Sequence, residues 1–371
     1  MKILIVTTVP ITFNFFKNQI KKLIQEGHEV HLASNFKKNS YNNSDMQLIK
    51  HNIEFSRNIF DVTNIRAYLQ FKDLVKKNDF DIIHTHTPIA STIVRLQKRT
   101  EAKIIYTAHG FHFYKGAPLK NWILFYPIER FLSRKTDDLI TINSEDYILA
   151  NKKFKMKHLH LINGPGIDLK ELKNTKEYTK KELGFSENDF LLIFGAELNA
   201  NKNQKLLIDA MYQLVKKYSN IKLLLVGVDN FNGEYQRYAR ELKLENHVYF
   251  FGMRTDIQKI IKACDVAVSS SKREGLGLFL IESGVHKLPI VATDNRGSRE
   301  IVKDGKNGFL CRFDVNDIAK KIEMLYINPH QFKENNADNQ ESYLKFSDDF
   351  VNKKLKKIYK QNMKLESEER I

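Results

Sequence analysis

Hydrophobic and polar positions follow two patterns along this chain, and together they predict strands and helices in alternation. Lys2–Val6 is a short apolar run rich in β-branched residues, which is typical of a buried strand. In the next segment Phe16, Ile20 and Ile24 recur at the four-residue spacing of an amphipathic helix. A second strand is predicted at Glu29–Ala33. This strand–helix–strand order indicates a doubly wound parallel sheet.

The same pattern begins again after residue 165, which divides the chain into two predicted α/β domains. Residues 163–166, Asn-Gly-Pro-Gly, are turn formers and predict the linker. Further apolar runs predict strands at Asp81–His84, Lys103–Thr107, Leu139–Asn143, Phe190–Phe194, Leu223–Val226, Val248–Phe251, Val266–Val268 and Ile290–Ala292. We expect two doubly wound Rossmann-like domains facing a central cleft, over residues 1–165 and 166–345. A basic helix at residues 346–363 should pack back onto the first domain.

Composition and charge narrow the class of protein. With 42% hydrophobic residues, the chain has an ordinary globular composition, which excludes a disordered or fibrous protein. The net charge is +16, of which residues 1–170 carry +11, so the first half should face an anionic partner. Cys264 and Cys311 lie in apolar runs and should be buried thiols. No run approaches the roughly 20 apolar residues that span a bilayer, and no signal peptide is evident, so we expect a cytoplasmic protein.

The strongest functional motif is Glu-Gly-Leu-Gly-Leu-Phe-Leu-Ile-Glu at residues 274–282, between a predicted strand and a predicted helix. Gly275 and Gly277 allow the backbone to approach a ligand closely. The N–H groups of Gly277, Leu278 and Phe279 would begin the helix and point at an anion. The glutamates at both ends of the motif can accept hydrogen bonds from sugar hydroxyls. The motif therefore favours a nucleotide-sugar site, and a strand–turn–helix with two incidental glutamates is the alternative.

This Glu-x7-Glu motif resembles the signature of the retaining GT-B glycosyltransferases of family 4. Other segments agree with the same family: residues 166–168, 251–257, 263–266, 289–293 and 300–308. Residues 106–113, Tyr-Thr-Ala-His-Gly-Phe-His-Phe, and residues 121–129 are characteristic of a branch that makes bacterial capsular polysaccharides and exopolysaccharides. The resemblance extends over essentially the whole chain. It implies an enzyme that transfers a sugar from a nucleotide-sugar donor.

The resemblance also assigns roles on the donor side. Glu282 would hold the ribose hydroxyls and Glu274 the donor sugar, while the amides from Gly275 to Phe279 would contact the sugar and the diphosphate. Because the helix amides and Lys202 would stabilise the leaving nucleoside diphosphate, we expect neither a metal nor a cofactor.

One position departs from the family's pattern. Lys202 matches the lysine of a basic pair that neutralises the diphosphate, but Glu197 stands where the family has the arginine. One of the two positive charges that would neutralise the diphosphate is therefore missing from its usual place. Arg254 or Lys205 could supply it.

Histidines are the candidate residues of the first half. His109 matches the family's active-site histidine beside the reacting sugar, and a packed strand-end histidine is the alternative. His86, His112 and Thr12 are candidates for the acceptor side, with packing as the alternative for His86 and a structural role for His112. The loop around Thr12 lacks Gly-x-Gly-x-x-Gly, so it gives no reason to expect NAD or FAD.

The implied reaction retains the anomeric configuration of the sugar. No carboxylate is placed as a nucleophile, as it would be in retaining glycosidases. We therefore expect attack from the same face of the sugar within an oxocarbenium-like ion pair. The departing phosphate would take the acceptor's proton, and His109 would orient the sugar or the acceptor. Asp79-Phe80-Asp81 spells the metal-binding Asp-x-Asp of other glycosyltransferases, but it begins a predicted strand and is expected to be structural.

The resemblance implies a lipid-linked acceptor. The acceptor would be a polyprenyl-diphosphate-linked saccharide at the inner face of the membrane, and the donor a UDP-hexose, UDP-N-acetylhexosamine or UDP-uronic acid. Residues 111–135 mix aromatic with basic side chains, and residues 152–157 add four lysines. Such segments suit an interface with anionic lipid headgroups, and a solvated basic face is the alternative.

Two other classes of protein remain open from the sequence. A nucleic-acid-binding protein fits the positive charge, but the basic residues are mixed with acids and no recognised binding module is present. A GT-B-like nucleotide-sugar epimerase or a non-catalytic binder fits the fold. The presence of both His109 and the Glu-x7-Glu motif argues against an inert binder.

Overall fold

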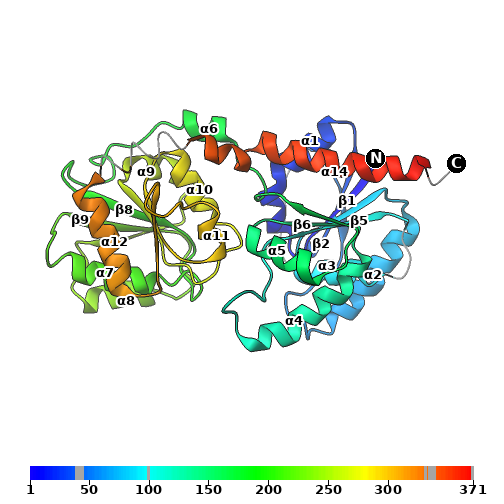
Figure 1. The fold of residues 1–371 in the computed structure, drawn as a ribbon, viewed down its shortest axis with the longest axis horizontal. Helices are drawn as coiled ribbons and strands as arrows, with labels where there is room; N and C mark the ends of the chain where they lie inside the picture. Colours follow the sequence, from blue (N-terminus) through cyan, green and yellow to red (C-terminus); the bar gives the residue numbers. More distant parts are fainter. Residues whose placement is uncertain (38–45, 98–100, 330–331, 333–339, 369–371) are drawn as a thin grey trace. The chain divides into compact units, whose positions relative to one another are not determined.

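The computed structural model describes residues 1–37, 46–97, 101–329, 332 and 340–368 (Figure 1). The chain forms two units. Unit 1 comprises Met1–Ile167 and Phe346–Ile371, and unit 2 comprises Asp168–Lys345. The boundaries expected from the sequence, 165/166 and 345/346, lie within two residues of these divisions.

Unit 1 is built on a seven-stranded sheet in which the strand pairs are parallel. In chain order the strands are β1 (Lys2–Val6), β2 (Glu29–Ser34), β3 (Ile49–Asn52), β4 (Ile82–Thr85), β5 (Lys103–Ala108), β6 (Asp138–Thr141) and β7 (His158–Leu161). Their order across the sheet is β3-β2-β1-β4-β5-β6-β7. The chain therefore winds outward from β1 to β3 and reverses direction at β4. Doubly wound sheets bind ligands at this kind of switch point, outside the carboxyl ends of the strands.

Helices cover both faces of the sheet because the central strands are apolar on both sides. On β1, Ile3 and Ile5 pack with residues of η1 (Pro10–Phe16) and α1 (Lys17–Gln25). Leu4 and Val6 point to the other face and pack with α2 (Thr63–Lys77) and α3 (Pro88–Arg95). The other described helices of this unit are α4 (Leu119–Leu132), η2 (Ser133–Lys135), α5 (Ser144–Lys153) and α14 (Asp348–Glu368).

The C-terminal helix α14 returns to unit 1, where it lies beside α1 (Figure 1). The backbone N–H of Ile167 donates to the carbonyl of Phe346 (2.9 Å), so the chain leaves and re-enters this unit at one place. Val351, Leu355 and Ile358 of α14 are buried in the same core as the strand residues of β1 and β2. This helix is therefore part of the first fold rather than a tail.

Unit 2 repeats the architecture with six parallel strands. The strands are β8 (Phe190–Gly195), β9 (Ile221–Val226), β10 (Val248–Gly252), β11 (Val266–Ser269), β12 (Ile290–Thr293) and β13 (Gly308–Cys311). The helices are α6 (Leu169–Asn174), α7 (Gln204–Leu214), α8 (Glu234–Glu241), α9 (Ile257–Ala263), α10 (Leu278–Val285), α11 (Arg296–Arg299), α12 (Val315–Ile327) and η3 (Gln340–Phe346). The strand order β10-β9-β8-β11-β12-β13 places the switch point between β8 and β11.

The two-domain α/β architecture expected from the sequence is confirmed, and each predicted strand overlaps an observed one. Cys264 and Cys311 are buried free thiols, also as expected. Burial raises the pKa of Cys311 to about 12, which leaves it unreactive at neutral pH. In the part of the chain that the structure describes, no helix combines the length and the apolar character needed to cross a membrane.

Candidate functional site

The candidate donor residues gather at the switch point of unit 2. The loop after β8 carries Glu197 and Lys202, and the loop after its neighbour β11 carries Glu274. Three hydrogen bonds join the two loops: Ser270 Oγ donates to the Lys202 carbonyl (2.8 Å), Asn201 Nδ2 to the Arg273 carbonyl (3.0 Å) and Lys272 N to the Asn201 carbonyl (2.7 Å). The topology thus brings together residues 72 positions apart in the chain.

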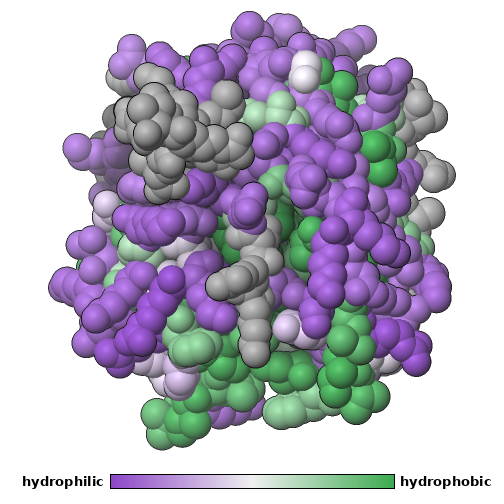
Figure 2. All heavy atoms as spheres, turned by 90° about the vertical axis from the view of Figure 1, so that its right-hand side faces the viewer, coloured by the Kyte–Doolittle hydropathy of each residue, from purple (hydrophilic) through white to green (hydrophobic). Residues whose placement is uncertain are grey.

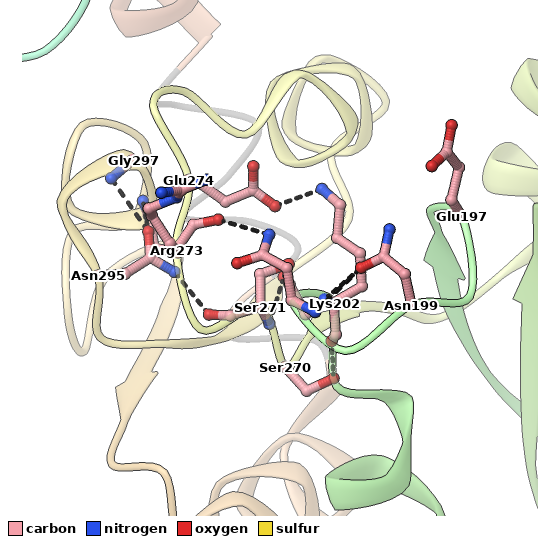
Figure 3. A network of polar contacts seen from close by, with 12 residues as sticks. Glu197, Asn199, Lys202, Ser270, Ser271, Arg273, Glu274, Asn295 and Gly297 are labelled. Atoms are coloured by element: carbon pink, nitrogen blue, oxygen red, sulfur yellow. Dashed lines mark hydrogen bonds and ion pairs between the residues drawn. The ribbon is translucent and has the colours of Figure 1, made fainter. Parts of the chain in front are cut away.

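Lys202 and Glu274 contact each other directly (Figure 3). The Lys202 ammonium lies 2.5 Å from the Glu274 carboxylate, and the two side chains are 25% and 15% exposed. The backbone N–H of Lys202 donates to Asn199 Oδ1 (2.9 Å), which fixes the loop that presents the lysine. The two candidate catalytic groups therefore form a half-buried ion pair at the switch point.

Residues after β12 hold Glu274 in place, and the sequence reasoning did not single them out. Asn295 caps α11 by accepting from the N–H groups of Gly297 (3.0 Å) and Ser298 (3.1 Å), and its amide donates to the Ser271 carbonyl (3.0 Å) (Figure 3). Gly297 packs so closely on Glu274 that a Cβ atom there would lie 2.6 Å from the Glu274 Cβ. The signal available in the sequence was the capping asparagine before a short polar helix.

The sequence predicted that the N–H groups of Gly277, Leu278 and Phe279 point at an anion, and the structure shows a different partner for one of them. Leu278 N–H donates to the Leu276 carbonyl (3.2 Å), so it is already engaged in a turn. Gly277, with φ −83°, is the residue before α10 and needs no left-handed conformation. The ring of Phe279 packs against β8, where a Cβ atom on Gly195 would lie 2.6 Å from it. Phe279 is therefore held by packing, with its backbone at the start of the helix.

Glu282, the second glutamate of the motif, lies one turn into α10 and is half-buried. Gln258 Nε2 donates to its carboxylate (2.8 Å), and Gln258 Oε1 lies 3.0 Å from His286 Nε2. Burial raises the pKa of Glu282, and burial together with Lys262 lowers the pKa of His286 to about 4. A hydroxyl that donates to Glu282 would relieve the cost of burying its charge.

Both residues first considered as replacements for the missing arginine, Arg254 and Lys205, already form ion pairs. Figure 3 shows Glu197 pointing away from the Lys202–Glu274 pair, and its carboxylate accepts from Asn230 Nδ2 (3.3 Å). Arg254 forms a two-point ion pair with Asp256 (2.6 and 2.7 Å), which lowers the pKa of that carboxyl. Arg254 also follows β10, the strand at the edge of the sheet.

Two further cations belong to this part of unit 2, and only one of them, Lys205, forms an ion pair among the described residues. Lys205 Nζ donates to Asp209 (3.1 Å) and to the Tyr238 hydroxyl (2.6 Å), so its charge is already engaged. Arg273, next to Glu274, is half-buried, and within the described part of the chain its guanidinium has no ion-pair partner. Arg273 is therefore a candidate for the second positive charge, on the same loop as Glu274.

In unit 1, His109 directly follows the strand β5 and contacts a second histidine. His109 Nε2 lies 3.2 Å from His86 Nδ1, and the ring of Phe16 stacks on His86 with the centroids 4.1 Å apart. His86 is only 3% exposed, so it does not line the surface as an acceptor-side residue would. In this structure His86 is packed against His109 and Phe16, which favours the packing alternative, and an acceptor-side role for His86 stays a prediction.

The histidine contacts continue into the sheet and reach α14. His84 Nδ1 lies 2.7 Å from the Tyr359 hydroxyl, and His84 Nε2 lies 2.8 Å from Thr107 Oγ1. Burial lowers the pKa of His84 to about 3 and that of His109 to about 4, and it holds the pKa of His86 well below its ordinary value. The three imidazoles are therefore neutral at physiological pH, and Tyr359 is a member of the network that motif reasoning missed.

Thr12 and His112 line one pocket at the switch point of unit 1. The pocket has a volume of about 440 Å³ and lies where β1 and β4 end, with Thr8 and Thr87 on its wall. Thr8 N–H donates to Thr87 Oγ1 (2.8 Å), which joins the two strand ends. The ring of His112 stacks on Phe125 of α4 with the centroids 4.6 Å apart.

The possible metal motif is structural. Asp81 accepts from the backbone N–H of Lys2 (2.7 Å) at the start of β4, so its carboxylate ties two strands together. Among the described residues, no three His, Cys, Asp or Glu side chains are grouped to hold a metal ion.

Comparison with known families covers both units. A family model described as glycosyl transferases group 1 matches residues 175–342, and one described as glycosyl transferase 4-like matches residues 2–143. Together they include the Lys202–Glu274 site and the histidine network. The chain belongs to this family of glycosyltransferases.

Individual relatives agree with the family. A Bacillus subtilis (strain 168) chain that carries the name glycosyltransferase EpsD is 39% identical over 381 residues, covering 100% of this chain and 99% of the relative. The Escherichia coli UDP-Gal:alpha-D-GlcNAc-diphosphoundecaprenol alpha-1,3-galactosyltransferase is 26% identical, over 72% of this chain and 71% of its own length. The crystal structure of Anabaena Alr3699/HepE in complex with UDP and glucose has a TM-score of 0.77 at 18% identity, covering 97% of this chain and 100% of that one. The fold class is thus confirmed as GT-B.

Proposed function

We propose that this glycosyltransferase moves a sugar from a UDP-sugar to a polyprenyl-diphosphate-linked saccharide during assembly of a capsular polysaccharide or exopolysaccharide, with retention of configuration. The observation that carries the proposal is the Lys202–Glu274 pair at the switch point of unit 2, beside the start of α10. The E. coli relative, whose name includes both UDP-Gal and a diphosphoundecaprenol-linked acceptor, supports these substrate classes.

In this proposal the positive groups of unit 2 receive the nucleoside diphosphate. Lys202 exchanges its contact with Glu274 for the diphosphate, and Arg273 supplies the second positive charge. The freed Glu274 carboxylate then accepts from hydroxyls of the donor sugar, while Glu282 accepts from the ribose. Charge that develops on the leaving group meets fixed cations and helix amides, so the reaction requires no metal ion.

His109, a residue of unit 1, orients the reacting sugar or the acceptor in this proposal. With its Nε2 turned to His86, its Nδ1 is the nitrogen left for the reacting sugar or the acceptor hydroxyl. Because the lowered pKa keeps the ring neutral, His109 orients this hydroxyl, and the departing phosphate takes the proton. This assignment supports same-face attack in an ion pair, which preserves the anomeric configuration.

The membrane side of the proposal rests on α4. Its exposed positions combine large apolar residues with basic ones: Leu119 (73% exposed), Ile123 (68%) and Phe131 (54%) lie with Lys120 and Arg130. Apolar groups that enter the headgroup region and cations that meet anionic lipids are the two features of an interfacial helix. We propose that this helix holds the enzyme at the inner face of the membrane, where a lipid-linked acceptor is found.

A donor-binding measurement tests the proposal. UDP-glucose, UDP-galactose, UDP-N-acetylglucosamine, UDP-N-acetylgalactosamine, UDP-glucuronate and GDP-mannose are titrated into the full chain by calorimetry. One or more UDP-sugars should bind, and Lys202→Ala should weaken that binding about ten- to a hundredfold, the value of a charge-assisted contact. Lys205→Ala is the matched control: Lys205 pairs with Asp209 on its own helix α7, and binding should stay unchanged. Absence of binding by all six donors, or equal loss in both variants, contradicts the proposal.

A further inference from the structure

The side-chain amide of Gln258, on α9, contacts two side chains that lie one turn apart on the neighbouring helix α10 (Figure 1). These are Glu282 and His286, which directly follows α10. The backbone N–H of His286 still donates to the Glu282 carbonyl (3.1 Å), so the two side chains share one face of the helix. Gln258 Nε2 donates to Glu282 Oε2 (2.8 Å), and Gln258 Oε1 lies 3.0 Å from His286 Nε2.

The chemistry of the three groups fixes the direction of these hydrogen bonds. An ionised carboxylate accepts hydrogen bonds and cannot donate them, so the amide turns its nitrogen to Glu282 and its oxygen to the imidazole. The amide oxygen also only accepts, so the His286 bond needs a proton on Nε2. Burial and Lys262 lower the pKa of His286 to about 4, and the neutral ring therefore carries its single proton there. The Gln258 amide cannot turn over without losing both bonds.

The Glu282 carboxylate can accept further hydrogen bonds. Gln258 occupies Oε2, and within the described ranges this carboxylate has no second hydrogen bond, which leaves Oε1 for a ligand. Burial raises the pKa of Glu282, and the bond from Gln258 opposes that rise. A half-buried carboxylate with one donor lacks partners for its remaining lone pairs, and ligand hydroxyls would supply them.

The position of Glu282 along α10 indicates which hydroxyls these are. Glu282 lies one turn, about 5 Å, after the helix start at Leu278. In the proposed function the diphosphate lies at the helix start, so the ribose that follows it in the nucleotide reaches this turn. Gln258 and His286 lie outside the Glu-x7-Glu motif, and the motif alone does not account for the orientation of its second glutamate.

We propose that Gln258, held by His286, is a positioning residue that turns Glu282 toward the ribose hydroxyls of the donor and so makes the enzyme select ribonucleotides. The inference rests on the proposed function, in which Glu282 accepts from the ribose, and adds to it the residues that set this specificity. A nucleotide without these hydroxyls leaves the half-buried carboxylate short of partners, and the site rejects it for that reason. Gln258 and His286 act through Glu282.

Calorimetric titration of the full chain with UDP and with dideoxyuridine diphosphate, which lacks both ribose hydroxyls, tests the proposal. Wild type should bind UDP about a hundredfold more tightly, the value of two hydrogen bonds to a charged group. Gln258→Met, a change that nearly conserves volume, should lower UDP affinity about tenfold and leave dideoxyuridine diphosphate affinity unchanged. Detergent is left out, because exposed hydrophobic side chains of unit 1, such as Leu119 and Ile123, would bind it and add heat. Figure 2 shows side chains of this kind gathered at the lower edge of the face it presents.

Two further variants separate positioning from helix packing. His286→Leu should lower UDP affinity about three- to tenfold, the value of one net hydrogen bond, and His286→Gln, whose Nε2 can replace the ring N–H, should restore most of it. Gln213→Met is the matched control. Gln213 Nε2 donates to Asn316 Oδ1 (3.0 Å) and so joins α7 to α12 in the same unit, and its loss should change the affinity for neither nucleotide.

Equal losses for both nucleotides in Gln258→Met would mean that the amide only ties α9 to α10, and an unchanged UDP affinity would mean that it has no part in binding. Either result overturns the proposal. Equal affinity of wild type for UDP and dideoxyuridine diphosphate also overturns it, and leaves the proposed function in place if a UDP-sugar binds. If none of the six nucleotide-sugars binds, the proposed function fails and this inference fails with it.

Discussion

Three different contacts position Glu274: one to its backbone carbonyl, one to its carboxylate and one to its Cβ atom. Its carbonyl accepts from Arg296 Nε (3.3 Å), its carboxylate meets Lys202, and Gly297 lies against its Cβ. Each contact restricts a different part of the residue. In the proposed reaction, a carboxylate held in this way would keep its geometry when the donor displaces the lysine.

The substitution Gly297→Ala tests the positioning of Glu274. The added methyl group would lie 2.6 Å from the Glu274 Cβ and 3.1 Å from its carbonyl, so the glutamate must shift. A displacement of about 1 Å at a reacting centre can cost about a hundredfold in rate, and we expect a fall of that size in kcat/KM for sugar transfer. Ser298→Ala, one residue on, removes a buried hydroxyl that lacks a described partner and should leave transfer unchanged. Equal rates in Gly297→Ala and wild type would contradict this.

His86 is expected to position His109 through the contact between Nδ1 and Nε2. His86→Leu removes it and should lower kcat about three- to tenfold, the value of one net hydrogen bond. His86→Asn places an amide near the position of Nδ1 and should restore most of the rate. The nitrogen shifts of the His109 ring, measured by NMR, should change in the leucine variant and return toward wild type with asparagine. A ring spectrum that is identical in all three proteins would contradict this role.

At the scale of elements, a buried ion pair joins α3 to α4. Arg95 lies 2.8 Å from Glu129, and their side chains are 1% and 9% exposed. The Arg95 guanidinium also lies 4.2 Å from the centre of the Tyr106 ring, on β5. Burial and the neighbouring Glu129 hold the pKa of Tyr106 well above its ordinary value. The helix proposed to meet the membrane is thus fixed to α3 and to the strand β5.

Removing one partner of this pair should be costly. Glu129→Ala leaves the Arg95 charge buried without compensation and should lower the free energy of unfolding by about 3–5 kcal/mol. Arg95→Met/Glu129→Leu removes both charges and should regain much of that loss. Urea unfolding followed by the fluorescence of Trp122, the only tryptophan, reports directly on α4. If the double variant is as unstable as the single one, the charge argument is wrong.

The sequence predicted the central strands better than the edges of the sheets. The strands it missed are β3, β7 and β13, and each lies at the edge of its sheet. Edge strands bury fewer side chains, so the apolar run that reveals a central strand is weak: β3 is Ile-Lys-His-Asn and largely exposed.

The glutamates and glycines of the motif at residues 274–282 could be predicted because they lie close together in the sequence. The contacts of Lys202 with Glu274 and of His86 with His109 depend on which strands are neighbours, and spacing along the chain does not carry that information.

At the scale of the whole molecule, three buried neutral histidines make unit 1 sensitive to acid. His84 and His109 have pKa values lowered to about 3 and 4, and the pKa of His86 is also lowered well below that of the unfolded chain, near 6.5. Between these values the unfolded state binds more protons than the folded state. Stability is therefore full above pH 6.5 and is lost as the pH falls toward 4.

The free energy of unfolding at pH 7 and at pH 5, from urea unfolding with Trp122 fluorescence, measures this effect. Each histidine that takes up a proton on unfolding contributes about 1.4 kcal/mol per pH unit in that interval. Wild type should be clearly less stable at pH 5, and His86→Asn should show a smaller difference. A free energy of unfolding that is the same at both pH values in wild type would contradict the neutral, buried state of these rings.

The central claim, sugar transfer to a lipid-linked acceptor, is tested most directly by mass spectrometry of the product. Undecaprenyl-diphosphate-linked N-acetylglucosamine in micelles, together with a panel of other lipid-linked monosaccharides, is incubated with each UDP-sugar and the full chain. We predict that one donor–acceptor pair gives a lipid heavier by one sugar residue, with equimolar release of UDP, and that Glu274→Ala forms none. No extended lipid with any pair, or undiminished product from Glu274→Ala, would contradict the account.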